Sequence, residues 1–515
     1  MNPLDLLDLL IIGAGPTGLA AAIEAARHGL RVRVVDDKPG PASVSRALVV
    51  HARTLEAFED MGLAAAVCAA GVPFAALNVT PVPGKPPIRV DLRALPWGDT
   101  RYPFWLSIPQ YATERCLEQR LAALGVRVDW STRFVGLTDR GDHVEVELRG
   151  PGELATTSRA RWLLGCDGGR SPVREAAGLG FVRTSLDQTF ILADALGDPG
   201  LPEDEGAAVL ARDGLLFVVP MPEPGRWRII AHLAGHRGDA PVVVDAPLLD
   251  HLLHTRLGVR FAARDVSWTS QFILKQGLAA RYRAGRVFIA GDAAHLHSPV
   301  GGQGLNTGVQ DAHALIWRLA LAERARPTHD ALLASYEAER RPIAARMVRN
   351  TGLATRLMTL RSGPLTALRG RVARVALQRR CVQRRLGRPL GMLDLVVTRS
   401  PIVLPGRAAG RRLPDPPHGA ARLRERLDPL RHTLLVLDDA PAGAHFVASL
   451  RAAGHPCVHV GPDWPDPDGA LRASLGGARL VIVRPDRIIA AAATTLDPDL
   501  LARYARALGV APAAL

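Results

Sequence analysis

The amino-acid sequence predicts an α/β protein in three parts, and three segments carry this prediction. Residues 9–35 follow the order strand, glycine turn, helix, strand of a βαβ unit. Residues 181–274 contain alternating stretches such as LLFVVPMP and WRIIAHL, which indicate a mostly antiparallel sheet. After a proline-rich stretch at 401–417, short apolar runs alternate with helical segments and indicate a small α/β unit.

These segments divide the 515 residues into a discontinuous first domain, an inserted second domain and a C-terminal third domain. We expect the first domain to comprise residues 1–180 and 275–395, with long helical runs over 305–395. We expect the inserted sheet domain to comprise 181–274, with a contribution from about 75–110, and the C-terminal domain to comprise 396–515.

The composition is that of a globular protein, with 48% hydrophobic and 22% charged residues. A net charge of +14 would suit a nucleic-acid binder. However, only three of the 64 basic residues are lysine, and arginines occur from end to end. The sequence shows no aromatic and basic strip and no helix-turn-helix pattern. We therefore expect no nucleic-acid partner and attribute the arginine content to a coding bias.

The five cysteines lie far apart and form no CxxC pair, so we expect neither a disulfide framework nor a metal site, as in a reducing cytoplasm. The N-terminal apolar stretch lacks a preceding basic region and is interrupted by Asp5 and Asp8, unlike a signal peptide. The sequence has no run of about eighteen apolar residues. We expect a cytoplasmic protein without a transmembrane segment.

Residues 361–388 form a local exception, because they contain nine arginines and no acidic residue. Apolar residues recur in this segment at helical spacing, namely Leu365, Leu368, Val372, Val375, Val382 and Leu386. The pattern predicts a helix that packs on the protein and exposes a basic side. The alternative is a helix that docks on a membrane surface or on a second subunit.

A glycine motif in the N-terminal βαβ unit predicts a dinucleotide-binding, Rossmann-like domain. Gly13 permits the tight turn, Gly15 lets the backbone approach a pyrophosphate, and Gly18 lets helix and strand pack closely. The N-terminus of the helix offers free N–H groups and partial positive charge to phosphates. Asp36 follows the second strand directly and is our candidate for the ribose hydroxyls, with adjacent Asp37 as the alternative.

Two further motifs narrow the prediction. CDGGRSPVR contains Asp167, Gly168 and Arg170, and GRVFIAGDAAHLHSPVGGQGLNTGVQDA contains Gly291 and Asp292. Together with GAGPTG, SRALVVHARTLE, IPQ and SYEAERRP, these motifs resemble the single-component FAD-dependent aromatic hydroxylases, the group that contains para-hydroxybenzoate hydroxylase and phenol hydroxylase. The similarity extends to VRPD near residue 483, as in longer members with a thioredoxin-like C-terminal domain.

The resemblance implies non-covalent FAD as cofactor and NADPH or NADH as co-substrate. It implies that Arg46 and Pro299 lie beside the reacting ring as catalytic candidates, and that a helix beginning near Leu305 directs its N-terminus at the flavin. The implied cofactor-binding residues are Gly13, Gly15, Pro16, Thr17, Gly18, Asp36, Asp37, Arg46, Gln110, Asp167, Gly168, Arg170, Gly291, Asp292, Pro299, Gly302, Gly304, Leu305 and Asn306.

The implied reaction is hydroxylation of a phenolic or polycyclic aromatic substrate with NAD(P)H and O2 through a flavin C4a-hydroperoxide. Family members are frequently dimers, so a homodimer is possible. Three alternatives on the same fold are epoxidation, Baeyer-Villiger oxidation and reduction. An alternative of another class is a flavin-binding protein without turnover.

Substrate contacts are expected from the inserted sheet and from the proline-rich segment before residue 110. Our pocket candidates are Phe217, Trp97, Trp105 and Gln188, with burial in the core as the alternative for each aromatic side chain. His295 and His297 are as consistent with structural hydrogen bonding as with catalysis. In the C-terminal domain Cys457 stands alone, so dithiol exchange is not expected.

Overall fold

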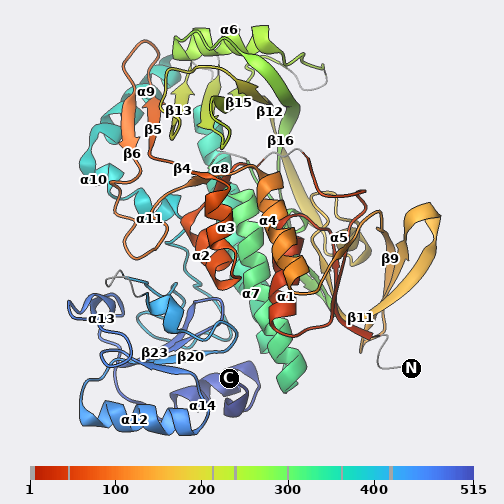
Figure 1. The fold of residues 1–515 in the computed structure, drawn as a ribbon, viewed down its shortest axis with the longest axis vertical. Helices are drawn as coiled ribbons and strands as arrows, with labels where there is room; N and C mark the ends of the chain where they lie inside the picture. The colour runs from red at the N-terminus through yellow and green to blue at the C-terminus, as the bar shows by residue number, and fades with distance from the viewer. Residues whose placement is uncertain are drawn as a thin grey trace.

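Two large sheets and one small sheet organise the chain in the computed structural model (Figure 1). The structure describes residues 6–43, 47–211, 214–236, 240–298, 301–360, 363–416 and 422–515, without the side chains of 186 and 187. Within these residues, no helix is both long enough and apolar enough to cross a bilayer.

The first sheet has a parallel core with the order β18-β11-β1-β2-β8, formed by β1 (Leu6–Ile12), β2 (Val32–Val35), β8 (Val128–Asp129), β11 (Ala155–Gly165) and β18 (Val287–Ile289). Leu9, Leu10 and Ile11 are fully buried, as expected for a central parallel strand covered on both faces. Antiparallel strands extend the sheet, namely β9 (Arg133–Asp139), β10 (Val144–Arg149) and β17 (Arg283–Ala284).

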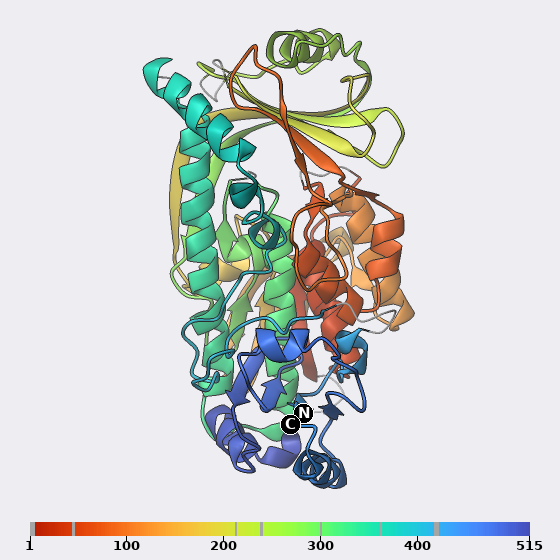
Figure 2. The same cartoon turned by 90° about the vertical axis from the view of Figure 1, so that its left-hand side faces the viewer.

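Long helices connect this sheet to the rest of the molecule. Helix α7 (Gly304–Ala325) is buried from Asn306 to Ala322 and packs against the alanine-rich α1 (Pro16–Arg27). Helix α8 (Ala331–Met358) packs beside α7 (Figure 2). Shorter helices complete this side, namely α2 (Ala52–Asp60), α3 (Ala64–Ala69), α4 (Gln110–Ala123) and α5 (Pro172–Ala176). A small sheet has the order β3-β7-β4 and is formed by β3 (Val49–Val50), β7 (Leu106–Ser107) and β4 (Val72–Pro73).

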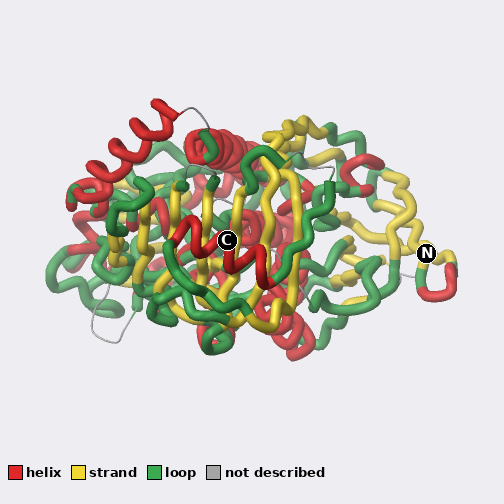
Figure 3. Tube along the Cα trace, turned by 90° about the horizontal axis from the view of Figure 1, so that it is seen from above, coloured by secondary structure: helices red, strands yellow, loops and turns green. Residues whose placement is uncertain are grey.

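The second large sheet has the order β19-β16-β12-β15-β14-β13-β5-β6 and is mostly antiparallel, as the alternating pattern predicts. Its strands are β5 (Ala76–Thr80), β6 (Ile88–Asp91), β12 (Phe181–Leu196), β13 (Glu205–Leu210), β14 (Leu215–Pro220), β15 (Arg226–His232), β16 (Arg264–Ala279) and β19 (His295–Leu296). Helix α6 (Ala246–Leu257) crosses over these strands (Figure 3), and its Leu249 and Leu253 pack in one cluster with Ile191 and Ile229. Segment 75–110 contributes β5 and β6 to this sheet.

The C-terminal unit contains a four-stranded sheet in the order β21-β20-β22-β23, with β20 and β21 parallel and the other pairs antiparallel. Its strands are β20 (Thr433–Val436), β21 (Cys457–His459), β22 (Leu480–Val483) and β23 (Ile489–Ala493). Its helices are α12 (Pro441–Ala452), α13 (Ala470–Ser474) and α14 (Leu500–Leu508). The unit, coloured blue in Figure 1, lies at the opposite end of the molecule from α6.

The basic segment is not the continuous helix that its pattern predicts. It forms α9 (Gly363–Gln378), α10 (Arg380–Gln383) and α11 (Gly387–Leu390). The break follows Gln378, because Arg379 has an extended backbone with ψ of 117°. Arg361 lies outside the described residues.

Candidate functional site

A cavity of about 880 Å³ lies where the carboxyl ends of β1, β2 and β11 face the second large sheet. This edge of a parallel sheet is the usual ligand site in open α/β folds. The first sheet contributes the turn after β1, the acids after β2 and the loop after β11. The start of α7 and side chains from β14 and β15 complete the wall.

The turn after β1 has the tight geometry that the glycine motif predicts. Gly13 has φ of +103°, and a Cβ atom there would lie 2.4 Å from the carbonyl oxygen of Cys166. A Cβ atom on Gly18 would lie 1.9 Å from the carbonyl oxygen of Gly13, so α1 can approach the turn only with glycine at this position. Asp36 Oδ2 accepts a 2.7 Å hydrogen bond from the Ala14 backbone N–H and thereby fixes the turn.

Two helices begin at the cavity wall without a side-chain cap among the described residues. Gly15 precedes α1 and Gln303 precedes α7, and both residues line the cavity. The first-turn N–H groups of each helix lack intrahelical acceptors, and the helix dipole adds partial positive charge. The wall therefore favours negatively charged groups at two points.

Two buried polar atoms on the wall have no hydrogen-bond partner among the described residues. They are Asp167 Oδ1 and His297 Nε2. Burial raises the pKa of Asp167, partly offset by Ser171 and the Val173 N–H, and burial lowers the pKa of His297 to about 4. A buried polar atom without a partner costs about 1–3 kcal/mol. The cavity is therefore built for a ligand that carries hydrogen-bonding groups.

The turn at Gly291–Asp292 rests on a buried network behind the wall. Asp311 Oδ2 lies 2.6 Å from His295 Nε2 and accepts a 3.2 Å bond from the Gly291 N–H, while Asp311 Oδ1 accepts from Arg340 at 2.7 Å. Arg340 holds the pKa of Asp311 low despite burial. His295 is thus structural, and Asp311 is a supporting residue that we did not predict. The signal was present in QDA and AERRP, which contain Asp311 and Arg340.

The opposite wall is apolar and aromatic. It is formed by Phe74, Leu77, Trp105, Phe217, Val219 and Ile230, which come mainly from β5, β14 and β15. The Trp105 indole N–H donates to the carbonyl oxygen of Leu390 at 2.6 Å, which fixes the ring at the wall. A pocket with polar groups on one side and aromatic groups on the other suits a flat organic molecule.

Most predicted cofactor residues meet at this cavity. The lining contains Gly13, Gly15, Pro16, Thr17, Asp36, Asp37, Gln110, Asp167, Gly168, Asp292, Gly302, Gly304 and Leu305. Gly18, Gly291 and Asn306 lie directly behind it. Asn306 donates to the Val49 and Gly302 carbonyls at 2.8 and 2.7 Å, so it supports the loop before α7. Cys166, Thr132 and Arg133 also line the cavity. Cys166 begins the motif CDGGRSPVR but is not among the predicted residues, and no sequence signal pointed to Thr132 or Arg133.

Besides Gly18, Gly291 and Asn306, three further predicted residues do not line the cavity. Arg170 is exposed to solvent outside the lining. Trp97 is 2% exposed and packs in the core, where its indole N–H donates to the Leu92 carbonyl at 2.6 Å. Gln188 belongs to β12 and is not one of the lining residues. Among the pocket candidates, Trp105 and Phe217 reach the wall. Arg46 and Pro299 lie outside the described residues.

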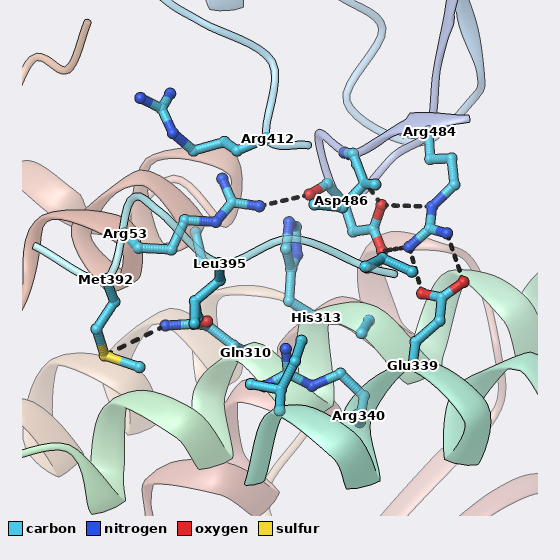
Figure 4. A pocket seen from close by; sticks show the side chains of 15 residues that line it. Arg53, Gln310, His313, Glu339, Arg340, Met392, Leu395, Arg412, Arg484 and Asp486 are labelled. Atoms are coloured by element: carbon cyan, nitrogen blue, oxygen red, sulfur yellow. Dashed lines mark hydrogen bonds and ion pairs between the residues drawn. The ribbon is translucent and has the colours of Figure 1, made fainter. Parts of the chain in front are cut away.

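A second polar region lies between the C-terminal unit and helices α2, α7 and α8 (Figure 4). Its cavity measures only about 40 Å³. Arg484 donates to both carboxylate oxygens of Glu339 at 2.8 and 2.9 Å and to Asp486 at 2.9 and 2.5 Å. Arg53 donates to the Asp486 carbonyl at 2.7 Å. We call this region, comprising Arg53, Arg318, Glu339, Arg484 and Asp486, the C-terminal joint.

Comparison with known proteins agrees with this geometry. Residues 7–351 match the model of the FAD binding domain family. The chain is 37% identical to the 6-methylpretetramide 4-monooxygenase of Streptomyces rimosus over 98% of this chain and 94% of that protein. It is 30% identical to the pentachlorophenol 4-monooxygenase of Sphingobium chlorophenolicum over 86% of this chain and 81% of that protein.

A solved structure extends the agreement to three dimensions. The OxyS anhydrotetracycline hydroxylase from Streptomyces rimosus superimposes with a TM-score of 0.78 at 31% identity, covering 97% of this chain and 98% of that chain. The predicted resemblance to the FAD-dependent aromatic hydroxylases is thereby confirmed. The chain belongs to the FAD binding domain family.

Proposed function

We propose that the chain is an FAD-dependent monooxygenase that hydroxylates a polycyclic or phenolic aromatic substrate in the 880 Å³ cavity, with NAD(P)H and O2 as co-substrates. The observation that carries the proposal is the two-sided wall, with the glycine turn and two helix N-termini opposite the aromatic face of the second sheet. Relatives named for aromatic and polycyclic substrates support the same reaction class.

FAD fits the polar side of the cavity. The turn at Gly13–Gly15 and the N-terminus of α1 suit the pyrophosphate, and Asp36 and Asp292 suit sugar and ribityl hydroxyls. The uncapped N-terminus of α7 stabilises negative charge at the edge of a flat ring. Asp167 Oδ1 has no hydrogen-bond partner in the described part of the chain, which favours a polar ligand on this side of the cavity. Bound FAD supplies the redox and oxygen-transfer chemistry.

The protein's own contribution is orientation and exclusion of water. Phe217, Trp105 and Ile230 cover an aromatic substrate and keep solvent from the reacting ring. His297 is neutral near pH 7, because burial lowers its pKa to about 4. Its Nε2 atom can therefore hydrogen-bond a substrate hydroxyl without bringing a positive charge. Arg46 and Pro299 remain candidates beside the ring from the sequence alone.

The C-terminal unit is, in this proposal, a thioredoxin-like domain with a structural role. The strand order and the single parallel pair support the assignment. Cys457 lies without a second cysteine nearby in sequence, and burial raises its pKa, so it is a poor nucleophile. The three-domain division of the sequence, a cytoplasmic location and a homodimer belong to the same proposal.

The test is turnover by the FAD-loaded protein. We expect polycyclic phenols to accelerate NAD(P)H oxidation and O2 uptake, with one atom of labelled O2 in a ring hydroxyl. Phe217→Ala should raise KM about tenfold, because burial of a phenyl ring is worth about 1.5–3 kcal/mol, while FAD affinity stays unchanged. Val182→Ala, at a 70% exposed position of β12, is the matched control.

Other outcomes distinguish the alternatives. Oxygen gained elsewhere than on a ring would indicate epoxidation or Baeyer-Villiger oxidation, and a reduced product without oxygen would indicate a reductase. Bound FAD without turnover across the panel would leave a flavin-binding protein. Failure to bind FAD would refute the proposal altogether.

A further inference from the structure

The excess positive charge of the chain is confined to one segment. Residues 340–393 contain fourteen arginines and no lysine, aspartate or glutamate. Removing these fourteen from the 64 basic residues leaves fifty, which equals the number of acidic residues in the whole chain. Over all other residues together, basic and acidic side chains are therefore equal in number. The net charge of +14 resides in the last part of α8 and in α9, α10 and α11.

Few arginines of this segment are neutralised within the protein. In the described part of the chain, Arg340 pairs with Asp311 and Arg388 pairs with Asp99, and the other arginines of the segment have no ion pair. Those that are exposed to solvent are Arg349, Arg356, Arg371, Arg379, Arg380, Arg384 and Arg385, besides Arg388. A dense positive field of this kind attracts an anionic partner.

Helix α9 presents an apolar row within this field. Leu365, Leu368, Val372 and Val375 are 51%, 58%, 59% and 54% exposed, and their spacing of three and four residues puts them on one face. Leu353 and Leu357, at the end of α8, are also 58% and 48% exposed. Single exposed apolar side chains are ordinary, whereas a continuous row marks an interaction site.

The opposite side of α9 is fixed to the protein. Gly370 lies so close to the connection between β5 and β6 that a Cβ atom would be 2.6 Å from the Pro81 carbonyl oxygen. Arg374 donates to the Pro86 carbonyl at 2.9 Å, and Arg369 donates to the Met358 carbonyl at 2.7 Å. The helix stands at the edge of the molecule (Figures 2 and 3). Because these contacts hold the opposite side of α9 against the protein, its apolar row faces solvent.

We propose that this surface docks on an anionic lipid bilayer. The α9 face, comprising Leu365, Leu368, Val372 and Val375 with Arg371 and Arg379, lies in the plane of the membrane. Arg371 is one helical turn from both Leu368 and Val375, and Arg379 follows the last residue of α9. The guanidinium groups therefore reach lipid phosphates while the apolar row enters the headgroup boundary.

The charge of the segment favours a lipid over a second copy of the chain. A symmetric dimer through the α9 face would bring two arginine-rich segments together, and like charges across an interface are unfavourable. An anionic bilayer instead complements the arginines and accepts the apolar row. A single partner then binds both the arginine side chains and the apolar row.

The experiment is flotation of the FAD-loaded protein with vesicles. We expect binding to vesicles of phosphatidylcholine with about half phosphatidylglycerol, weak binding to phosphatidylcholine alone, and release by added salt. Leu368→Gln with Val372→Gln should weaken binding at least tenfold or so, because two side chains no longer enter the bilayer. Leu154→Gln with Val243→Gln, at positions 66% and 77% exposed elsewhere, should bind normally.

A second pair of variants tests the charge. Arg371→Gln with Arg379→Gln should remove most of the preference for phosphatidylglycerol, whereas Arg127→Gln with Arg264→Gln, also exposed, should keep it. The flavin absorption spectrum checks folding in every variant. The proposal fails if the native protein does not float with anionic vesicles, or if both α9 variants bind as it does. It also fails if light scattering shows a dimer that the α9 variants dissociate.

Discussion

The cavity and the C-terminal joint are both polar, buried and lined by residues from distant parts of the chain, yet they are built in opposite ways. In the joint, Arg484 is hydrogen-bonded to Glu339 and Asp486, and only about 40 Å³ of space remains. In the cavity, Asp167 Oδ1 and His297 Nε2 have no hydrogen-bond partner among the described residues, and about 880 Å³ remains. The paired charges of the joint leave space for little more than water, whereas the cavity has space for a ligand beside its polar groups.

The joint explains the VRPD sequence, whose Arg484 and Asp486 hold the C-terminal unit against α7 and α8. Arg318 also donates to Glu339 at 2.6 Å, so one carboxylate serves two guanidinium groups. Residues of this kind resemble a catalytic cluster in composition. Their complete pairing shows that they hold two parts of the protein together.

The largest expected effect is the loss of Glu339. Glu339→Ala leaves Arg318 and Arg484 buried with one acidic partner between them, and removing one member of a buried ionic cluster costs about 3–5 kcal/mol. We expect this decrease in the free energy of unfolding by chemical denaturation. Glu153→Ala, which removes surface ion pairs to Arg133 and Arg149, is the control and should change stability little. Equal effects of the two variants would mean that the joint is not a structural contact.

A smaller effect with a different readout is expected in the cavity. Asp292→Ala removes an exposed carboxylate from the wall, and the loss of charge-assisted hydrogen bonds should weaken FAD binding about tenfold to a hundredfold. Stability without FAD should fall less than in Glu339→Ala, because Asp292 is exposed to solvent whereas Glu339 is buried between two arginines. Asp468→Ala, exposed in the C-terminal unit, is the control in a fluorescence titration. An unchanged FAD affinity would show that Asp292 does not bind the cofactor.

The third prediction concerns acidification. Burial lowers the pKa of His297 from its ordinary value near 6.5 to about 4, so the unfolded chain binds this proton first. Stability from this group is complete above pH 6.5 or so and declines by about 1.4 kcal/mol per pH unit as the pH falls toward 4. His297→Asn should flatten the dependence of the unfolding free energy on pH over this range. An identical slope in the variant would contradict the assignment.

His313, which borders the joint, should respond in the opposite direction. Burial disfavours its charged form, but Asp60 at 3.5 Å and Glu24 at 3.6 Å outweigh burial and raise the pKa. The contribution of His313 is therefore present below pH 6.5 or so and is lost as the pH rises through the raised pKa. His313→Asn should remove this loss on the alkaline side. The contributions of His297 and His313 to the unfolding free energy therefore change with pH in opposite directions. This difference in sign distinguishes the ligand cavity from the charge-paired joint.

Tryptophan placement illustrates what could not be predicted. Trp97 and Trp105 lie in the same proline-rich segment, yet Trp105 lines the cavity and Trp97 is buried in the core. The partners that fix the two indole groups are the carbonyls of Leu390 and Leu92, respectively. Because Leu390 is 285 positions from Trp105, the residues around Trp105 in the sequence do not predict this contact.

The sequence by itself determined the βαβ unit, the glycine turn, the acids that follow its strands, the mostly antiparallel second sheet and the arginine-rich segment. These features depend on local rules, since strand and helix periodicity and the space around glycine are set by near neighbours. Only the tertiary structure decided that Asp311 supports the Gly291 turn, that Arg484 and Asp486 are paired, and that the apolar row of α9 faces outward. Those outcomes depend on which side chains meet across long loops, and the packing of the whole chain selects them.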